Sequence, residues 1–171
     1  MIDLFCFEWS GLIAIRGRGS QLSNDSRIEE DNMPTYTAEI IIEASTQKVF
    51  EALTRPELVK LWQYGRVVTT DWKIGSKIKF RSEEQGSMET LEQWGTILDI
   101  RPNEFIKYGL FTPRADPEDK TENYCVTSYV LSNDNGHTRI EIIQEGNSPS
   151  GFAPSTLKPI LVALKRVAET R

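Results

Sequence analysis

Hydrophobic and polar residues alternate along several stretches of this 171-residue chain. The first stretch, YTAEIIIEA at 36–44, is rich in β-branched residues and places Ala38, Ile40 and Ile42 on one face. Because successive side chains of a strand point to opposite faces, this pattern predicts a β-strand with one buried face. The same period predicts strands in further stretches, at 66–72, 76–82, 88–100, 104–111, 124–132 and 137–143.

Other stretches follow a helical period. Ser45 is a favourable N-cap for a helix over 46–53. Pro56 ends that helix because proline has no N–H to donate, and it suits the first turn of a second short helix, 56–62. A longer amphipathic helix is predicted over 156–171, with an apolar face made of Leu157, Ile160, Leu161, Leu164, Val167 and Ala168.

The order of these elements predicts an α+β fold. One strand and two short helices come first, then antiparallel strands joined by turns such as NDNG at 133–136, then the long helix. The apolar stripe of that helix has to lie on one face of a curved sheet of about six to seven strands. A cavity is expected wherever sheet and helix do not touch. Gly95, inside a predicted strand, indicates a bulge or a close approach of two backbones.

The composition argues against nucleic-acid binding and against binding to anionic membranes. Hydrophobic residues make up 39% of the chain and charged residues 26%, which is ordinary for a globular protein. The formal net charge is −5 and the basic residues are scattered, so the chain lacks the basic stripe that nucleic acids or anionic membranes require. Cys6 and Cys125 match no metal-binding or CxxC spacing, which indicates reduced thiols in a cytoplasmic protein.

The first residues differ from the rest. Asp3 and Glu8 interrupt the apolar start, which therefore resembles neither a signal peptide nor a membrane span, and a polar stretch follows. We expect residues 1–34 to form a disordered or weakly structured tail and residues 35–171 to form the folded domain. The alternative is an amphipathic docking segment that uses Leu4, Phe5, Phe7, Trp9, Leu12 and Ile13.

No group of residues has the spacing of a catalytic or metal site. His137, the only histidine, follows a hairpin turn and has no second histidine to share a metal ion. Cys125 lies in a predicted strand without a base nearby in sequence, which indicates a buried structural thiol. The acidic residues of one region are expected to be a solvated edge, namely Glu83, Glu84, Glu89 and Glu92. We therefore expect no catalytic residue, no metal and no cofactor.

Aromatic residues are the most distinctive feature of the folded part. A buried tryptophan or tyrosine needs a partner for its N–H or O–H, which favours boundaries and pocket walls over the centre of a core. Ordinary core packing is the alternative, and we expect it for Phe50 and Phe80. The aromatic set comprises Trp62, Trp72, Phe80, Trp94, Tyr108, Phe111, Tyr129 and Phe152.

Several motifs occur in an order and spacing typical of one superfamily. They are IEAS at 42–45, QKVFEALTRPELVKLW at 47–62, DWKIGSKIKF at 71–80, WGTILDIRPNEFIKY at 94–108 and HTRIEIIQEG at 137–146. With them the chain resembles the START-like (SRPBCC) helix-grip superfamily, also called Bet v 1-like. Within it, the chain resembles the family of the activator of heat shock protein 90 ATPase homologue, in its C-terminal domain. The resemblance covers residues 35–170.

This resemblance implies a non-enzymatic protein that binds an apolar or amphipathic small molecule between the sheet and the C-terminal helix. The charged loop 112–123 would form a rim of the pocket. The residues expected to line the pocket are Trp62, Trp72, Trp94, Tyr108, Tyr129, Phe152, Leu157 and Leu161.

Two alternatives come from the same resemblance. One is a protein that binds a heat-shock chaperone and stimulates its ATPase. The other is a small cyclase or hydrolase that uses the same pocket, for which the candidate polar residues are Arg101, Tyr108, Tyr129 and Arg139. For each of these functions the protein is expected to be a monomer or dimer.

Overall fold

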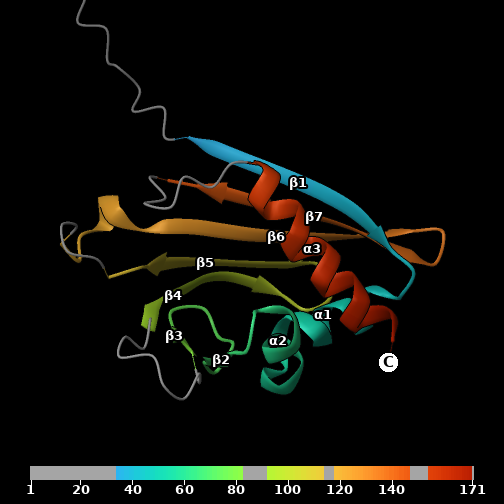
Figure 1. The fold of residues 1–171 in the computed structure, drawn as a ribbon, viewed down its shortest axis with the longest axis horizontal. Helices are drawn as coiled ribbons and strands as arrows, with labels where there is room; N and C mark the ends of the chain where they lie inside the picture. The colour runs from blue at the N-terminus through green and yellow to red at the C-terminus, as the bar shows by residue number, and fades with distance from the viewer. Residues whose placement is uncertain (1–33, 83–91, 114–117, 147–153, 171) are drawn as a thin grey trace, which may run out of the picture. The chain divides into compact units, whose positions relative to one another are not determined.

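The computed structural model describes residues 34–82, 92–113, 118–146 and 154–170. Figure 1 shows the elements in chain order, coloured from blue to red. They are β1 (Thr35–Ile42), α1 (Thr46–Thr54), α2 (Pro56–Trp62), β2 (Arg66–Thr69), β3 (Lys77–Ser82), β4 (Glu92–Arg101), β5 (Phe105–Phe111), the 3-10 helix η1 (Thr121–Asn123), β6 (Cys125–Asp134), β7 (His137–Glu145) and α3 (Pro154–Glu169).

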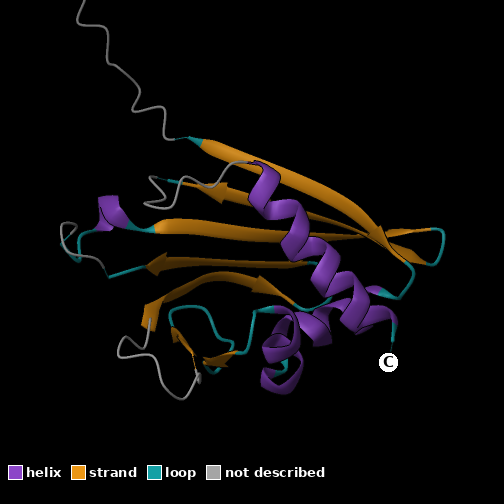
Figure 2. Ribbon diagram, viewed as in Figure 1, coloured by secondary structure: helices purple, strands orange, loops and turns teal. Residues whose placement is uncertain are grey.

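The strands form one antiparallel sheet in the order β1-β7-β6-β5-β4-β3-β2. Figure 2 shows the three helices on one side of this sheet, with α3 crossing it. We call the sheet face toward α3 the inner face and the opposite one the outer face. The predicted α+β helix-grip fold is confirmed.

The helix α3 covers the inner face with one apolar stripe. Leu157, Leu161 and Leu164 are fully buried, and their spacing of four and three residues keeps them on one side of the helix. The helix begins at Pro154, close to the predicted start, and Pro159 falls early in it. α3 packs against β1 and against both short helices, so it covers the sheet from one edge.

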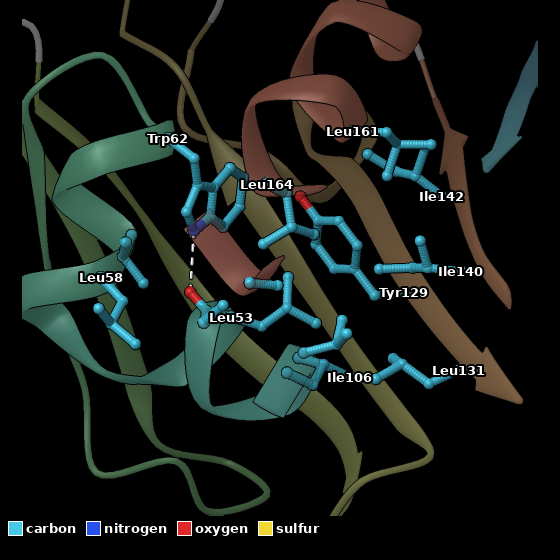
Figure 3. Close-up of a cluster of buried hydrophobic side chains, with 14 of the residues drawn as sticks. Leu53, Leu58, Trp62, Ile106, Tyr129, Leu131, Ile140, Ile142, Leu161 and Leu164 are labelled. Atoms are coloured by element: carbon cyan, nitrogen blue, oxygen red, sulfur yellow. Dashed lines mark hydrogen bonds between the residues drawn. The ribbon is translucent and has the colours of Figure 1, made fainter. Parts of the chain in front are cut away.

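Both tryptophans near the two short helices bind carbonyls at the end of α1. The carbonyl of Ala52 would accept a helical hydrogen bond from residue 56, but that residue is a proline without an N–H. The indole Nε1 of Trp62 donates to this carbonyl at 2.8 Å instead, as Figure 3 shows. The indole Nε1 of Trp72 donates to the carbonyl of Thr54, also at 2.8 Å. The two indoles therefore satisfy carbonyls that α1 leaves without a helical partner.

The strand predicted at 66–72 is shorter than expected. β2 ends at Thr69, and Trp72 has a φ of 51°, a left-handed conformation that strands do not use. The bond from Trp72 to Thr54 lies outside the sheet and holds this turn against α1. The prediction failed here because tertiary bonding of the indole outweighed the alternating pattern.

Some predictions concern residues outside the described ranges. Residues 1–33 of the predicted tail, the start of the strand at 88–100, and Phe152 all lie there. The two-part division of the chain stays a prediction. No helix within the described ranges is long and apolar enough to cross a membrane.

β4 and β5 approach each other closely at Gly95, as the sequence indicated. A Cβ atom added to Gly95 would lie 1.7 Å from the carbonyl oxygen of Gly109 and 2.8 Å from its carbonyl carbon. Both are backbone atoms of a paired strand, so they cannot turn aside as a flexible side chain could. A Cβ added to Gly109 meets nothing closer than 3.6 Å, an ordinary contact.

Replacing Gly95 with alanine is expected to lower the free energy of unfolding by about 3 kcal/mol, because β4 must move away from β5. Gly109→Ala is the matched control in the facing strand and is expected to change it by no more than about 0.5 kcal/mol. Urea unfolding followed by tryptophan fluorescence measures both. Equal costs for the two variants would contradict the close approach.

Candidate ligand-binding cavity

A cavity of about 220 Å³ lies between the inner face of the sheet, the helix α3 and the turn that follows α2. It is larger than the cavity of about 150 Å³ that holds benzene in an engineered protein. The lining residues are Gln63, Tyr64, Arg66, Phe80, Gln93, Tyr108, Leu110, Thr112, Asn123, Cys125, Thr127, Tyr129, Gln144 and Ile160.

The alternation of side chains along the strands builds this wall. On β6, Cys125, Thr127 and Tyr129 all line the cavity because every second residue points inward. The next inward residue, Leu131, belongs to the hydrophobic core. The core in Figure 3 gathers Leu131 with inward residues such as Ile106 and Ile140. The inner face is therefore apolar at one end of the strands and mixed at the other, where the cavity lies.

Aromatic rings form the deep wall of the cavity. The ring of Tyr108 lies between two others, with its centroid 6.0 Å from that of Phe80 and 6.3 Å from that of Tyr129. Trp62 meets Tyr129 edge to face at 6.3 Å on the core side. Such contacts fix the ring positions, so this wall is preformed.

The two tyrosine hydroxyls are hydrogen-bonded and neutral. Burial raises the pKa of Tyr108 to about 12, although the hydrogen bond from Tyr129 lowers it in part. Burial also raises the pKa of Tyr129 well above its usual value, and the nearby Tyr108 adds to this rise. Both phenols therefore keep their protons at neutral pH, where they act as hydrogen-bonding groups and not as bases.

A charged group lies at the edge of the cavity. The guanidinium Nη2 of Arg66 donates to Oε1 of Gln93 at 2.6 Å, and Nε2 of Gln93 donates to the hydroxyl of Thr112 at 2.6 Å. The guanidinium carbon lies 5.8 Å from the centroid of the Phe80 ring. Burial lowers the pKa of Arg66, while Tyr108 raises it.

A second amide lies in the cavity wall on β7. Nε2 of Gln144 donates to the hydroxyl of Thr127 at 3.2 Å, whereas its buried Oε1 has no partner among the described residues. Turning the amide over would leave an unpaired donor in the same place. Gln144 therefore carries one unsatisfied polar atom in either orientation. This is costly in a packed interior.

The thiol of Cys125 also lines the cavity. Burial raises its pKa, and a hydrogen bond with Thr127 lowers it in part. A thiol held in its protonated form is a weak nucleophile. None of the cavity's described lining residues is a histidine or a carboxylate. Within the described part of the chain, no cluster of three or more His, Cys, Asp or Glu could hold a metal ion.

The residues expected to line a pocket are distributed over three regions. Tyr108 and Tyr129 line the cavity. Trp62, Leu157 and Leu161 are buried in the core beside it, and Trp72 packs against that core. These four are not among the lining residues, and Phe152 is outside the described ranges.

Trp94 lies on the outer face. Its ring packs on Phe111 with centroids 5.3 Å apart, and its Nε1 donates to Oδ2 of Asp119 at 3.0 Å. The outer face also holds Arg139, which pairs with Glu39 and Asp134. Because these side chains are on the opposite side of the sheet, neither can contribute to the cavity. His137 is exposed at the start of β7.

Sequence reasoning missed the polar residues of the wall, above all Arg66, Gln93, Thr127 and Gln144. A signal for one of them was present in the alternation itself. Ile140, Ile142 and Gln144 continue one inward-facing series along β7, so the sequence places an amide where the pattern calls for an apolar residue.

Wider depressions exist elsewhere on the described surface, including one of about 550 Å³ near Arg101 and one of about 430 Å³ beside Trp94. They are more open to solvent than the cavity under α3. A site that binds an apolar molecule has to exclude water, so the smaller and deeper cavity is the better candidate.

Comparisons with known proteins agree with the resemblance seen in the sequence. A model of the family described as Activator of Hsp90 ATPase homolog 1-like protein matches residues 43–157. A solved structure from Cytophaga hutchinsonii is 29% identical, with a TM-score of 0.67, and the match covers 80% of this chain and 94% of that chain. No match was found among functionally curated proteins.

Two further solved structures share the fold at lower identity. A protein of Mesorhizobium loti is 20% identical with a TM-score of 0.64, covering 80% of this chain and 98% of that chain. The Aha1 dimer of Colwellia psychrerythraea is 21% identical with a TM-score of 0.60, covering 80% of this chain and 97% of that chain. Likeness at this level shows the fold alone.

The tyrosine pair predicts how stability depends on alkaline pH. Folding raises both phenol pKa values above the ordinary value of about 10, so their contribution is complete below about pH 10 and is lost as pH rises through about 12. Tyr108→Phe removes one phenol and the acceptor for Tyr129. We expect this variant to be less stable by about 1 kcal/mol at pH 8, with the gap narrowing above pH 10.

Urea unfolding at a series of pH values measures this difference. Tyr64→Phe is the control, because Tyr64 is exposed and its ring is not part of the hydrogen-bonded pair. A gap between wild type and Tyr108→Phe that stays constant to pH 11 would show that the pair does not titrate as described.

Proposed function

The chain belongs to the family of Activator of Hsp90 ATPase homolog 1-like proteins, and we propose that it is a non-enzymatic protein that binds an apolar or amphipathic small molecule under α3. The observation that carries this proposal is the preformed cavity with its aromatic wall and few polar groups. Ligand sites in proteins typically have this composition. The volume of about 220 Å³ suits one ring with a short substituent, since the pockets that hold drug-sized ligands measure about 300–1,000 Å³.

The polar groups of the cavity support binding more than catalysis. General acid–base chemistry needs a group that gains and loses a proton near neutral pH. The phenols of Tyr108 and Tyr129 stay protonated there, and the thiol of Cys125 has no base beside it among the lining residues. Arg66 is an inward-facing arginine of the kind that a cyclase or hydrolase would need. It supplies only an electrophilic group, because the described wall contains no base to work with it.

Stimulation of a heat-shock chaperone is the second candidate function, and the family description is the observation that favours it. This activity would use a surface and not the cavity. An ATPase assay with the chaperone of the same organism separates the two candidates, since blocking the cavity should leave chaperone stimulation unchanged.

The cavity can be blocked from α3 with little change elsewhere. Ile160 lies half-buried in the cavity wall, whereas Val162 on the same helix is 37% exposed and outside the wall. Ile160→Trp is expected to fill the cavity and weaken binding of a small ring compound at least about tenfold, at a stability cost of about 1–3 kcal/mol. Val162→Trp adds the same ring outside the cavity and should bind as the wild type does.

NMR titration with uncharged phenylpropanamide measures this, with thermal unfolding to show that each variant is folded. In the wild type, the shifted signals should include the amides of Tyr108 and Thr127. Native mass spectrometry of freshly purified wild type should show a retained small molecule that Ile160→Trp lacks. A folded Ile160→Trp protein that binds as tightly as the wild type would refute the cavity as the binding site.

A further inference from the structure

We propose that the ligand of this cavity is an apolar acid whose carboxylate pairs with Arg66. This inference rests on the proposed function and adds the chemical class of the ligand. It begins from the charge of the wall: Arg66 is the one ionised side chain among the described lining residues, and no aspartate or glutamate lies among them. The wall therefore carries one positive charge in a chain whose formal net charge is −5.

The register of the edge strands directs Arg66 inward. Val68 of β2 pairs with Phe80 of β3, and both side chains are buried on the inner face. Arg66 lies two residues before Val68, so it points to the same face. The groups that it contacts confirm this position, because Gln93 and Phe80 both line the cavity.

Arg66 differs from three other cations of the sheet in its partners. Lys79, Lys107 and Arg139 each pair with a carboxylate on the strands. Arg66 has no carboxylate partner within the described ranges, and Gln93 is its one hydrogen-bond acceptor there. A guanidinium offers five N–H donors, so most of its capacity is left for another group.

Partial burial of a cation without a carboxylate partner is unfavourable. Binding of an anion beside it is therefore favourable. Water is partly removed from Arg66 in this position, as the lowered pKa of its guanidinium indicates. A carboxylate would restore the lost interactions with two parallel N–H···O bonds, the geometry that arginine favours. The aromatic wall beside Arg66 would bury the apolar part of the same molecule. Together they describe an organic acid better than an inorganic anion.

The alternative is that Arg66 is only a structural residue, held by Gln93 and by the ring of Phe80. Removing it would then lower stability and affect all ligands equally. The discriminating quantity is therefore the ratio of affinities for an acid and its amide, which a purely structural role would not change.

We suggest titrating the full chain with phenylpropionate, its uncharged amide phenylpropanamide, and the cationic phenylpropylamine. Wild type is expected to bind the acid about tenfold or more tightly than the amide, and the amine most weakly. Octanoate is a fourth probe that distinguishes a ring acid from a short fatty acid with the same carboxylate. The acid that binds more tightly shows whether the apolar part of the ligand is an aromatic ring or an alkyl chain.

Three variants locate the effect. Arg66→Gln keeps a hydrogen-bonding group toward Gln93 but removes the charge, and it should bring acid and amide within about twofold of each other. Arg66→Lys should recover part of the preference. Arg81→Gln removes the same charge from an exposed position on the outer face of β3 and should keep the wild-type ratio.

The possible results separate the inference from the proposed function. Equal binding of acid and amide by the wild type overturns the inference and leaves the binding function in place, since the amide still binds. Loss of the preference in Arg81→Gln as well as in Arg66→Gln also overturns it, because net charge would then be the cause. If none of the four probes binds to the wild type, both the inference and the proposed function fail.

Discussion

One helix has to bury its apolar stripe against a sheet that is much wider than the helix. Seven strands separated by about 4.8 Å span roughly 29 Å, whereas a helix with its side chains is only about 10 Å across. α3 meets this constraint by packing at the β1 edge and against α1 and α2, which cover more of the inner face. The cavity lies where the helices do not fill the space above the inner face, with Ile160 of α3 and Gln63 and Tyr64 after α2 in its wall. It is thus a consequence of the architecture, and the sequence decides whether it is filled.

The two short helices are held in place by two indoles that bind carbonyls left free at the end of α1. Pro56 begins α2 and leaves the carbonyl of Ala52 without its helical donor. Trp62, at the end of α2, bonds to this carbonyl and also meets Tyr129 of the cavity wall edge to face. The position of the helix pair and that of the aromatic wall are therefore coupled through one side chain. The tryptophans lie at the ends of elements because their N–H groups are needed there.

Most of the fold could be predicted from the sequence, since alternation and helical spacing are local signals that tertiary packing reinforced. The residues of the cavity wall were harder to predict. A shift of one residue along a strand exchanges its inward-facing and outward-facing side chains. Ile100 faces inward. Strict alternation along the strand would therefore place Trp94, six residues earlier, on the inner face as well. A bulge between Ile97 and Asp99 shifts the register, so Trp94 points outward while Gln93 lines the cavity. Leu98, at the bulge, is not a glycine of the kind that often marks a bulge in a sequence.

The polar wall residues break the local rules that the rest of the inner face follows. Apolar residues in place of Arg66, Thr127 and Gln144 would have continued the alternation and filled the space under α3. Leu131 and Ile140 are such apolar residues at the other end of the strands, where the core is packed. The chain keeps instead a half-buried cation without a carboxylate partner in the described ranges and an amide oxygen without a hydrogen bond. Both features lower the free energy of unfolding. Such departures from a consistent core are expected at functional sites, where a bound molecule supplies the missing partner. The composition of the wall therefore suits the binding of a small molecule with a polar end better than it suits a packed hydrophobic core.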